Sequence, residues 1–355
     1  RRAAGKGLTP MVMEGQKRLE LILLMICAGC LILLGASRWG WVLSAGDVNT
    51  DPYIEIYPAR VGEVALHGDE AELGRLEHAV CESDRLLYLA EPLMQGEDVA
   101  ELQKGLQQQG IYQGTISGVF DRQTMQAVLN FQRQQGLQRD GVVGPQTWQS
   151  LADNFPVPVI EGTRPIPEGE REIVIDVSRL QLIVYIDGKE YQRFPVAVGL
   201  SKTPSPIGEF RIVHKSMNWG GGFGTRWLGL NVPWGIYGIH GTNKPWSIGT
   251  RASGGCIRMF NRHVEQLFGL VPEGTLVRMV GRTSDPVHRH LKPGSCGQDV
   301  ITLQLSLRAK GYDPGLADGR YGEQTAEAVK GLQQHYSLMP DGLGWPDVYL
   351  LLGVR

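Results

Sequence analysis

The chain has 355 residues, a formal net charge of −2, 42% hydrophobic residues and 20% charged residues. This near-neutral balance excludes a globally basic surface for nucleic acid and an acidic disordered tail. The length predicts two or three domains, and the 47 glycines predict many turns and loops.

The N-terminus is predicted to reach a membrane. Residues 1–20 form a basic segment, and residues 21–43 form a transmembrane anchor or signal segment, since 21–36 carry no charge. We expect an anchor, and hence a single-pass protein of the cell membrane whose domains lie on the outer side. Secretion after cleavage near Leu43-Ser44-Ala45 is the alternative, and lipidation at Cys30 is a third. The basic residues before the apolar run are Arg1, Arg2, Lys6, Lys17 and Arg18.

Two segments have the composition of connections between domains. Residues 47–90 show no clear hydrophobic period and are interpreted as a spacer, with a short helix expected at 70–80. Residues 154–171 are rich in proline, which is typical of a semi-rigid linker.

A repeat flanks the centre of the chain. Residues 96–142 recur at 297–343 with a constant offset of 201 residues and no gap. Each copy has apolar residues at helical spacing, then a glycine-rich loop, then a second helix that we expect to open at Thr124 in the first copy. With a third short helix, expected around 146–151 in the first copy, each becomes a small three-helix domain. The predicted domains are 91–153 and 291–353.

The region between them, 172–281, is predicted to be mostly β. Asp187-Gly188 lies between two β-rich runs and indicates a hairpin. One helix is expected at 264–268, with Asn261 as its cap. The expected strands are 173–177, 180–186, 191–198, 209–214 and 276–280.

Chemistry concentrates at 236–260. Cysteine attacks as a thiolate, so it needs a lowered pKa or a base, and His240 is the only histidine close upstream of Cys256. Gly254 and Gly255 permit a tight turn before Cys256, and the amides of Gly255 and Cys256 are natural oxyanion donors. Arg258 adds positive charge for a thiolate or a substrate carboxylate. A buried structural cysteine remains the alternative at this level.

The other cysteines and the histidines predict no metal site and no cofactor. Cys27 and Cys30 lie in the apolar segment, and a pairing of Cys81 with Cys296 stays open. The chain has no HExxH motif, no metal-binding pairs of cysteines and no phosphate-binding loop of the GxxxxGK type.

These segments resemble known families. The run with His240-Gly241 followed by Ser253, Gly255, Cys256, Ile257 and Arg258 resembles the signature of L,D-transpeptidases, as does 194–212. The two repeats resemble peptidoglycan-binding domains that begin G-x-D-V-x-x-L-Q. The implied architecture is a mostly β, β-sandwich-like catalytic domain between two three-helix peptidoglycan-binding domains, with an N-terminal transmembrane helix.

The resemblance implies an acyl transfer on peptidoglycan. Cys256 would be the nucleophile and His240 the general base, with the Gly241 carbonyl holding the imidazole tautomer and Ser253 and Arg258 lining the site. The product would be a 3→3 cross-link between stem peptides. Water as the acceptor would make the enzyme an L,D-carboxypeptidase, which is one alternative. The family usually has histidine where this chain has Gly254, so a silent wall-binding scaffold is the other alternative. The partners implied are peptidoglycan and the membrane, and no nucleic acid.

Overall fold

A computed structural model describes residues 85–159, 165–218, 220–282 and 289–354. The predicted anchor at 21–43, the helix at 70–80 and Cys81 lie outside these residues. Within the described ranges, no helix combines the length and apolar character needed to cross a membrane.

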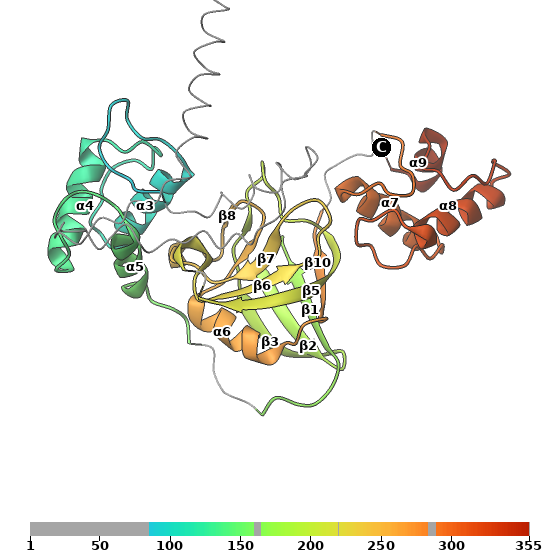
Figure 1. Cartoon of the computed structure of the whole chain (residues 1–355), viewed down its shortest axis with the longest axis horizontal. Helices are drawn as coiled ribbons and strands as arrows, with labels where there is room; N and C mark the ends of the chain where they lie inside the picture. The colour runs from blue at the N-terminus through green and yellow to red at the C-terminus, as the bar shows by residue number, and fades with distance from the viewer. Residues whose placement is uncertain (1–84, 160–164, 219, 283–288, 355) are drawn as a thin grey trace, which may run out of the picture. The chain divides into compact units, whose positions relative to one another are not determined.

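The central domain is built on one eight-stranded sheet with the order β3-β2-β1-β10-β5-β6-β7-β9 (Figure 1). A separate pair joins β4 (Val198–Gly199) to β8 (Arg251–Ser253). This confirms a mostly β domain, although β6 and β7 were not predicted because both are short and contain glycine. The strands of the large sheet are β1 (Arg171–Asp176), β2 (Gln181–Ile186), β3 (Lys189–Pro195), β5 (Gly208–Met217), β6 (Arg226–Leu230), β7 (Tyr237–His240), β9 (Ile257–Arg258) and β10 (Leu276–Val280).

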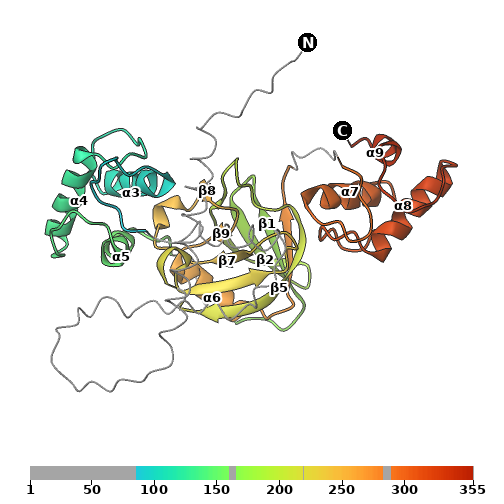
Figure 2. The same ribbon diagram turned by 45° about the horizontal axis from the view of Figure 1, so that its top comes forward.

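The sheet curls at β5, so the mostly β domain is built on one continuous curled sheet. The first half of β5 pairs with β10, and its second half pairs with β6. The register shifts between Ile212 and His214, and an extra residue of this kind bends a strand and increases its twist. The β1 and β10 strands thus connect continuously to the β6, β7 and β9 side of the domain (Figure 2).

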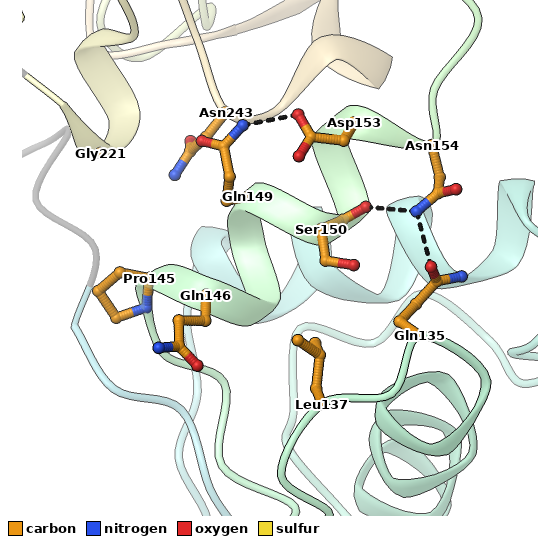
Figure 3. Close-up of a pocket in the computed structure, with 10 residues that line it drawn as sticks. All are labelled: Gln135, Leu137, Pro145, Gln146, Gln149, Ser150, Asp153, Asn154, Gly221 and Asn243. Carbon is orange, nitrogen blue, oxygen red and sulfur yellow. Dashed lines mark hydrogen bonds between the residues drawn. The ribbon is translucent and has the colours of Figure 1, made fainter.

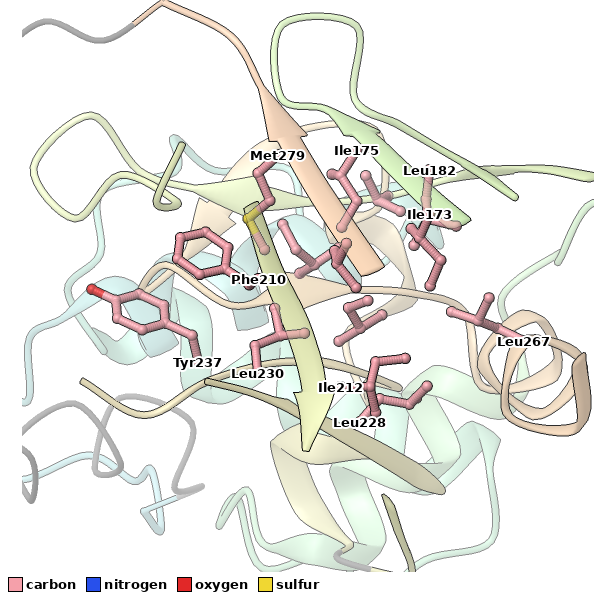
Figure 4. Packing of buried hydrophobic residues seen from close by; sticks show 14 of the residues in the cluster. Ile173, Ile175, Leu182, Phe210, Ile212, Leu228, Leu230, Tyr237, Leu267 and Met279 are labelled. Atoms are coloured by element: carbon pink, nitrogen blue, oxygen red, sulfur yellow. The ribbon is translucent and has the colours of Figure 1, made fainter. Parts of the chain in front are cut away.

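The concave side of this sheet holds the core. Ile173 and Ile175 of β1 alternate inward, and they meet Phe210 of β5 and Leu228 of β6 (Figure 4). Burying a side chain of this size contributes roughly 1.5–3 kcal/mol. Helix α6 (Asn261–Leu270) packs against β6 and β7 and adds Leu267 to the same cluster.

Helix α6 begins differently from the prediction. Its N-cap residue is Phe260, and Asn261 is the first helical residue, so the expected Asn261 cap is wrong. The Asn261 side chain instead accepts hydrogen bonds from two loops, because its carbonyl oxygen lies beside the backbone amides of Thr225 and Thr242.

The flanking domains each contain three helices. In the first helical domain (85–155), α4 begins two residues before the predicted Thr124, because the Asp121 carboxylate accepts a hydrogen bond from the Thr124 amide at 2.8 Å and caps the helix. The helices are α3 (Glu97–Gln108), α4 (Arg122–Gln134) and α5 (Pro145–Asp153) in the first domain, and α7 (Gln298–Ala309), α8 (Glu323–His335) and α9 (Pro346–Leu352) in the second (289–354).

A buried glutamine holds each copy together in the same way. The Gln103 amide donates to the Val119 carbonyl and the Thr124 hydroxyl, both at 3.0 Å. Gln304, its counterpart in the second copy, donates to the Arg320 carbonyl and the Thr325 hydroxyl, both at 3.1 Å. A satisfied buried amide costs little and specifies the loop conformation, which explains why the repeat retains it.

The first helical domain contacts the β domain through Trp246. This side chain is 4% exposed and belongs to the hydrophobic cluster of the helical domain. Its ring stacks on Trp148 with centroids 6.1 Å apart, and its indole N–H donates to Glu101 at 3.1 Å. Trp246 therefore fills the contact between the two domains, and we call it the interdomain plug.

The second helical domain contacts the β domain through Glu209 of β5. Both Glu209 carboxylate oxygens accept from the Arg308 guanidinium, at 2.9 and 2.8 Å, and one also accepts from the Ala317 amide. The Gln298 side chain pairs with the backbone N–H and C=O of Ile207. Ile301 and Ala317 are buried in the cluster of the β domain, so the contact is a packed interface.

Candidate active site

Two neighbouring strands bring the candidate nucleophile and base to one edge of the sheet. Strand β7 ends at His240 and pairs in parallel with β9, with Ile239 opposite Ile257 and His240 opposite Arg258. Cys256 directly precedes β9, so it lies beside β7, since paired strands run about 4.8 Å apart. The pairing therefore brings together two segments that are sixteen residues apart in the chain.

His240 is fully buried and makes a short hydrogen bond. Its Nδ1 lies 2.6 Å from the carbonyl oxygen of Gly241. Because a carbonyl oxygen can only accept, Nδ1 carries the proton and the lone pair of the neutral ring is on Nε2. This is the tautomer that a general base requires when Nε2 is the atom that takes the proton.

Aromatic side chains surround the imidazole. Trp227 of β6 stacks on the His240 ring with centroids 5.5 Å apart and planes inclined by 21°. Phe223 meets the same ring edge-on at 5.1 Å. Trp227 is itself oriented by a hydrogen bond of 2.9 Å from its indole N–H to Nε2 of His214. Sequence reasoning missed both aromatic residues, since they lie on elements that it did not predict.

Cys256 is half-buried, with its Sγ 3.9 Å from the carbonyl oxygen of Ile236. Burial raises the pKa of the neighbouring Tyr237 phenol, and the negative charge of a Cys256 thiolate raises that pKa further. The raised pKa keeps the Tyr237 phenol protonated at neutral pH.

The turn before Cys256 is fixed by Ser253 and Gly255. The Gly255 amide donates to the Ser253 hydroxyl at 3.1 Å, and that hydroxyl donates to the Cys256 carbonyl at 2.5 Å. The Gly255 amide is thus already used, which differs from the expectation that it donates to an oxyanion. Gly255 also has a φ of +124°, and a Cβ there would lie 2.8 Å from the Tyr237 ring.

The remaining predicted site residues take three different places. Ser253 is fully buried and supports the turn. Arg258 is 3% exposed, so its charge lies inside the protein. Its backbone N–H donates to the Ala197 carbonyl, and its carbonyl accepts from the Ala197 N–H. Gly254 is half-buried between Ser253 and Gly255.

A hollow of about 660 Å³ lies next to this region but does not contain it (Figure 3). Most of its lining comes from the first helical domain, and the β domain adds Gly221 and Asn243, the latter three residues after His240. Its polar groups pair with one another: Gln149 donates to Asp153 at 2.7 Å, and Asn154 donates to Gln135 at 3.0 Å. Neither Cys256 nor His240 lines it.

Neither a metal site nor a disulfide is present in the part of the chain that the structure describes. That part contains no group of three or more histidine, cysteine, aspartate or glutamate side chains suited to a metal ion. Cys256 and Cys296 form no disulfide there. Cys296 is exposed, and the pairing with Cys81 falls outside the described residues.

Two family models match the chain. The L,D-transpeptidase catalytic domain, YkuD, matches residues 170–279. A domain described as "Putative peptidoglycan binding domain" matches 95–151 and again 296–343.

Individual relatives are similar to about a third of the chain. "Putative L,D-transpeptidase YkuD" of Bacillus subtilis is 43% identical over 105 residues, which cover 30% of this chain and 63% of that protein. The protein of the same name from Bacillus licheniformis is 41% identical over 128 residues, which cover 36% of this chain and 74% of that protein. Among solved structures, the catalytic domain of the Enterococcus faecium L,D-transpeptidase aligns with a TM-score of 0.29 and 24% identity over 32% of this chain and 98% of that one.

The family match at 170–279 covers the curled sheet except for Val280, the last residue of β10, and includes both Cys256 and His240. The first match to the peptidoglycan-binding domain, 95–151, spans nearly all of the three helices before the sheet, and the second, 296–343, spans α7 and α8 and ends before α9. The chain therefore belongs to the L,D-transpeptidase family, with a YkuD-type domain flanked by two peptidoglycan-binding domains.

Proposed function

We propose that this protein is a cysteine L,D-transpeptidase that joins peptidoglycan stem peptides by 3→3 cross-links. The observation that carries the proposal is the His240 Nδ1 hydrogen bond to the Gly241 carbonyl, next to the parallel pairing that brings Cys256 beside β7. Together they supply a proton acceptor of defined tautomer and a thiol at one sheet edge.

In the first step the Cys256 thiol gives its proton to His240, and the thiolate attacks the carbonyl of the third residue of a tetrapeptide stem. The C–N bond to the terminal D-Ala breaks, and His240 returns the proton to the leaving amine. A thioester between Cys256 and the tripeptide remains.

In the second step the amine of a neighbouring stem attacks the thioester. His240 takes the proton of that amine, and the sulfur leaves as the thiolate. The net reaction converts two tetrapeptide stems into one cross-linked dimer and one free D-Ala. Water in place of the amine would give a tripeptide, which is the L,D-carboxypeptidase reaction.

The two flanking domains would hold the enzyme on the wall. Each is packed against the β domain. Wall bound to these domains would therefore place its stem peptides at a fixed position relative to the catalytic domain, which a flexible linker would not do. We also propose that segment 21–43 anchors the protein in the membrane, with its domains on the outer side. Fractionation with and without external protease tests this, since a cleaved, secreted form would appear in the medium.

The function is tested with the full chain, wild type and Cys256→Ala, on a defined tetrapeptide stem read by mass spectrometry. We expect the wild type alone to form a dimer that lacks one terminal D-Ala. Tripeptide without dimer would assign the hydrolase instead. Wall binding with no product from either protein would assign the scaffold and point to Gly254.

A further inference from the structure

Asn261 connects three parts of the β domain that meet at the candidate base. It is the first residue of α6, and its side-chain oxygen accepts from the backbone amide of Thr242 at 3.1 Å and from that of Thr225 at 3.2 Å. The first amide lies just after β7 and the second just before β6. One oxygen therefore joins the helix to both loops.

The Thr242 amide belongs to the same peptide unit as the Gly241 carbonyl. A trans peptide unit is planar, and its N–H and C=O point to opposite sides. Asn261 holds the N–H side of this unit, and His240 Nδ1 lies 2.6 Å from its carbonyl oxygen on the other side. The hydrogen bond from Thr242 to Asn261 therefore aims the Gly241 carbonyl at the imidazole.

The space around the Asn261 oxygen is shaped for this contact. A Cβ on Gly241 or on Gly224 would collide with that oxygen. Gly224 also has a φ of +64°, a conformation that other residues rarely adopt. The two loops can therefore approach Asn261 because both positions lack a side chain.

The hydrogen bond from His240 Nδ1 to the Gly241 carbonyl selects the orientation of the ring. Stacking on Trp227 and the edge contact with Phe223 hold the plane of the His240 ring. A half-turn about the Cβ–Cγ bond would preserve that plane but would exchange the positions of Nδ1 and Cδ2. The hydrogen bond to the Gly241 carbonyl distinguishes the two orientations, because carbon cannot replace Nδ1 as a strong donor.

We propose that Asn261 is a positioning residue for the base: by holding the Gly241–Thr242 peptide unit, it fixes the tautomer and orientation of His240. The inference rests on the proposed function, in which Nε2 of His240 takes the proton of Cys256. The Asn261 side chain does not itself accept that proton.

The test compares Asn261→Ala and Asn261→Asp in the full chain. Asn261→Ala should lower kcat by about 10- to 100-fold with little change in KM, because the ring loses its orientation. Asn261→Asp keeps an acceptor oxygen and should restore most of that loss. Its added negative charge should move the acid limb of the pH profile to higher pH.

The matched control is Asn231→Ala. The Asn231 oxygen accepts from the Arg211 amide at 2.7 Å, so it makes the same kind of contact in the same domain away from His240. This variant should leave kcat and the pH profile unchanged, which separates positioning of the base from a general loss of stability.

A second readout does not depend on turnover. Long-range ¹⁵N–¹H spectra of the histidines should show His240 as the Nδ1–H tautomer in the wild type and as a mixture of tautomers in Asn261→Ala. If both proteins show the same single tautomer, or if Asn261→Asp is as slow as Asn261→Ala, the inference is wrong. An inactive wild type would overturn the proposed function, while the spectra would still decide the role of Asn261.

Discussion

The two helical domains share one fold but contact the β domain in different ways. At aligned positions, Gly105 corresponds to Ser306 and Gln107 to Arg308. In the first domain, the Trp246 ring packs against Gly105, which has no side chain in the way. In the second domain, the Arg308 guanidinium donates hydrogen bonds to the Glu209 carboxylate. The buried glutamine amides that both copies share thus stabilise the common fold. The surface positions at which the copies differ determine how each one contacts the β domain.

The two contacts also lie at different distances along the chain from the candidate base. Trp246 follows His240 by six residues, in the loop that continues from Gly241 and Thr242. Glu209 lies on β5, near the bend of the sheet. Loosening the first contact should therefore disturb catalysis more than loosening the second.

The largest effect is expected from Trp246→Ala. Removal of a buried indole from the cluster of the first helical domain should cost about 3–5 kcal/mol of stability. It should also lower activity, because the loop after His240 loses its anchor. Calorimetry together with the stem dimerisation assay measures both.

Trp345→Ala is the control for that change, since Trp345 of the second domain is 38% exposed. Its free energy of unfolding should lie within about 1 kcal/mol of the wild-type value, and the variant should remain active. Equal losses in the two variants would contradict the view that Trp246 is a special contact.

Gly105→Ala tests the same interface from the opposite side. A Cβ on Gly105 would lie 2.9 Å from the Trp246 ring, so the indole must shift, at a cost of about 1–3 kcal/mol. Ser306→Ala, the aligned change in the second copy, should be nearly neutral because it adds no volume. Thermal unfolding of both variants measures this difference. A Gly105→Ala protein as stable as the wild type would show that the Trp246 side chain is loosely packed.

Arg308→Ala should release the second helical domain while sparing catalysis. The Glu209 side chain is 12% exposed and would lose its bidentate partner. Because Arg308 is 40% exposed, solvent screens the pair, and we expect the free energy of unfolding to fall by only about 1–2 kcal/mol. Proteolysis between 282 and 289 should accelerate. The control is Arg193→Ala, whose pair with Glu190 is 44% exposed on both sides and should contribute little.

The smallest effect is a difference in pH response between the two contacts. Burial lowers the pKa of His263, whose Nε2 donates to the Pro158 carbonyl after the first helical domain. A base with a lowered folded pKa contributes stability above its ordinary value of 6.5 and loses it as pH falls below that value.

Glu209 responds at lower pH. Burial raises its pKa, but hydrogen bonds from Arg308 and the Ala317 amide outweigh burial, so the pKa lies below the ordinary 4.5. Its contribution is present above pH 4.5 and is lost as pH falls through the folded pKa. Acidification should therefore loosen the linker at Pro158 first and the second domain later, as followed by limited proteolysis with an acid-tolerant protease. His263→Gln should abolish only the first of these changes.

Local pattern in the sequence was enough for much of the organisation. The repeat at an offset of 201 residues, the helical spacing in each copy and the Asp187-Gly188 hairpin all report neighbours within a few residues of one another. The segment around Cys256 likewise contained its own signature. These features follow from short-range chemistry, which a linear chain records directly.

Long-range contact decided the rest. Strand β7, which ends at His240, is stable because it pairs with β6 and β9, and its four residues include Gly238, so it has no strong strand pattern of its own. Asn261 resembled a helix cap in the sequence, yet its oxygen binds amides 19 and 36 residues away. Trp246 could not be distinguished from a surface loop residue until another domain covered it. Each case depends on a partner that is distant in the chain, and only tertiary structure specifies which partner that is.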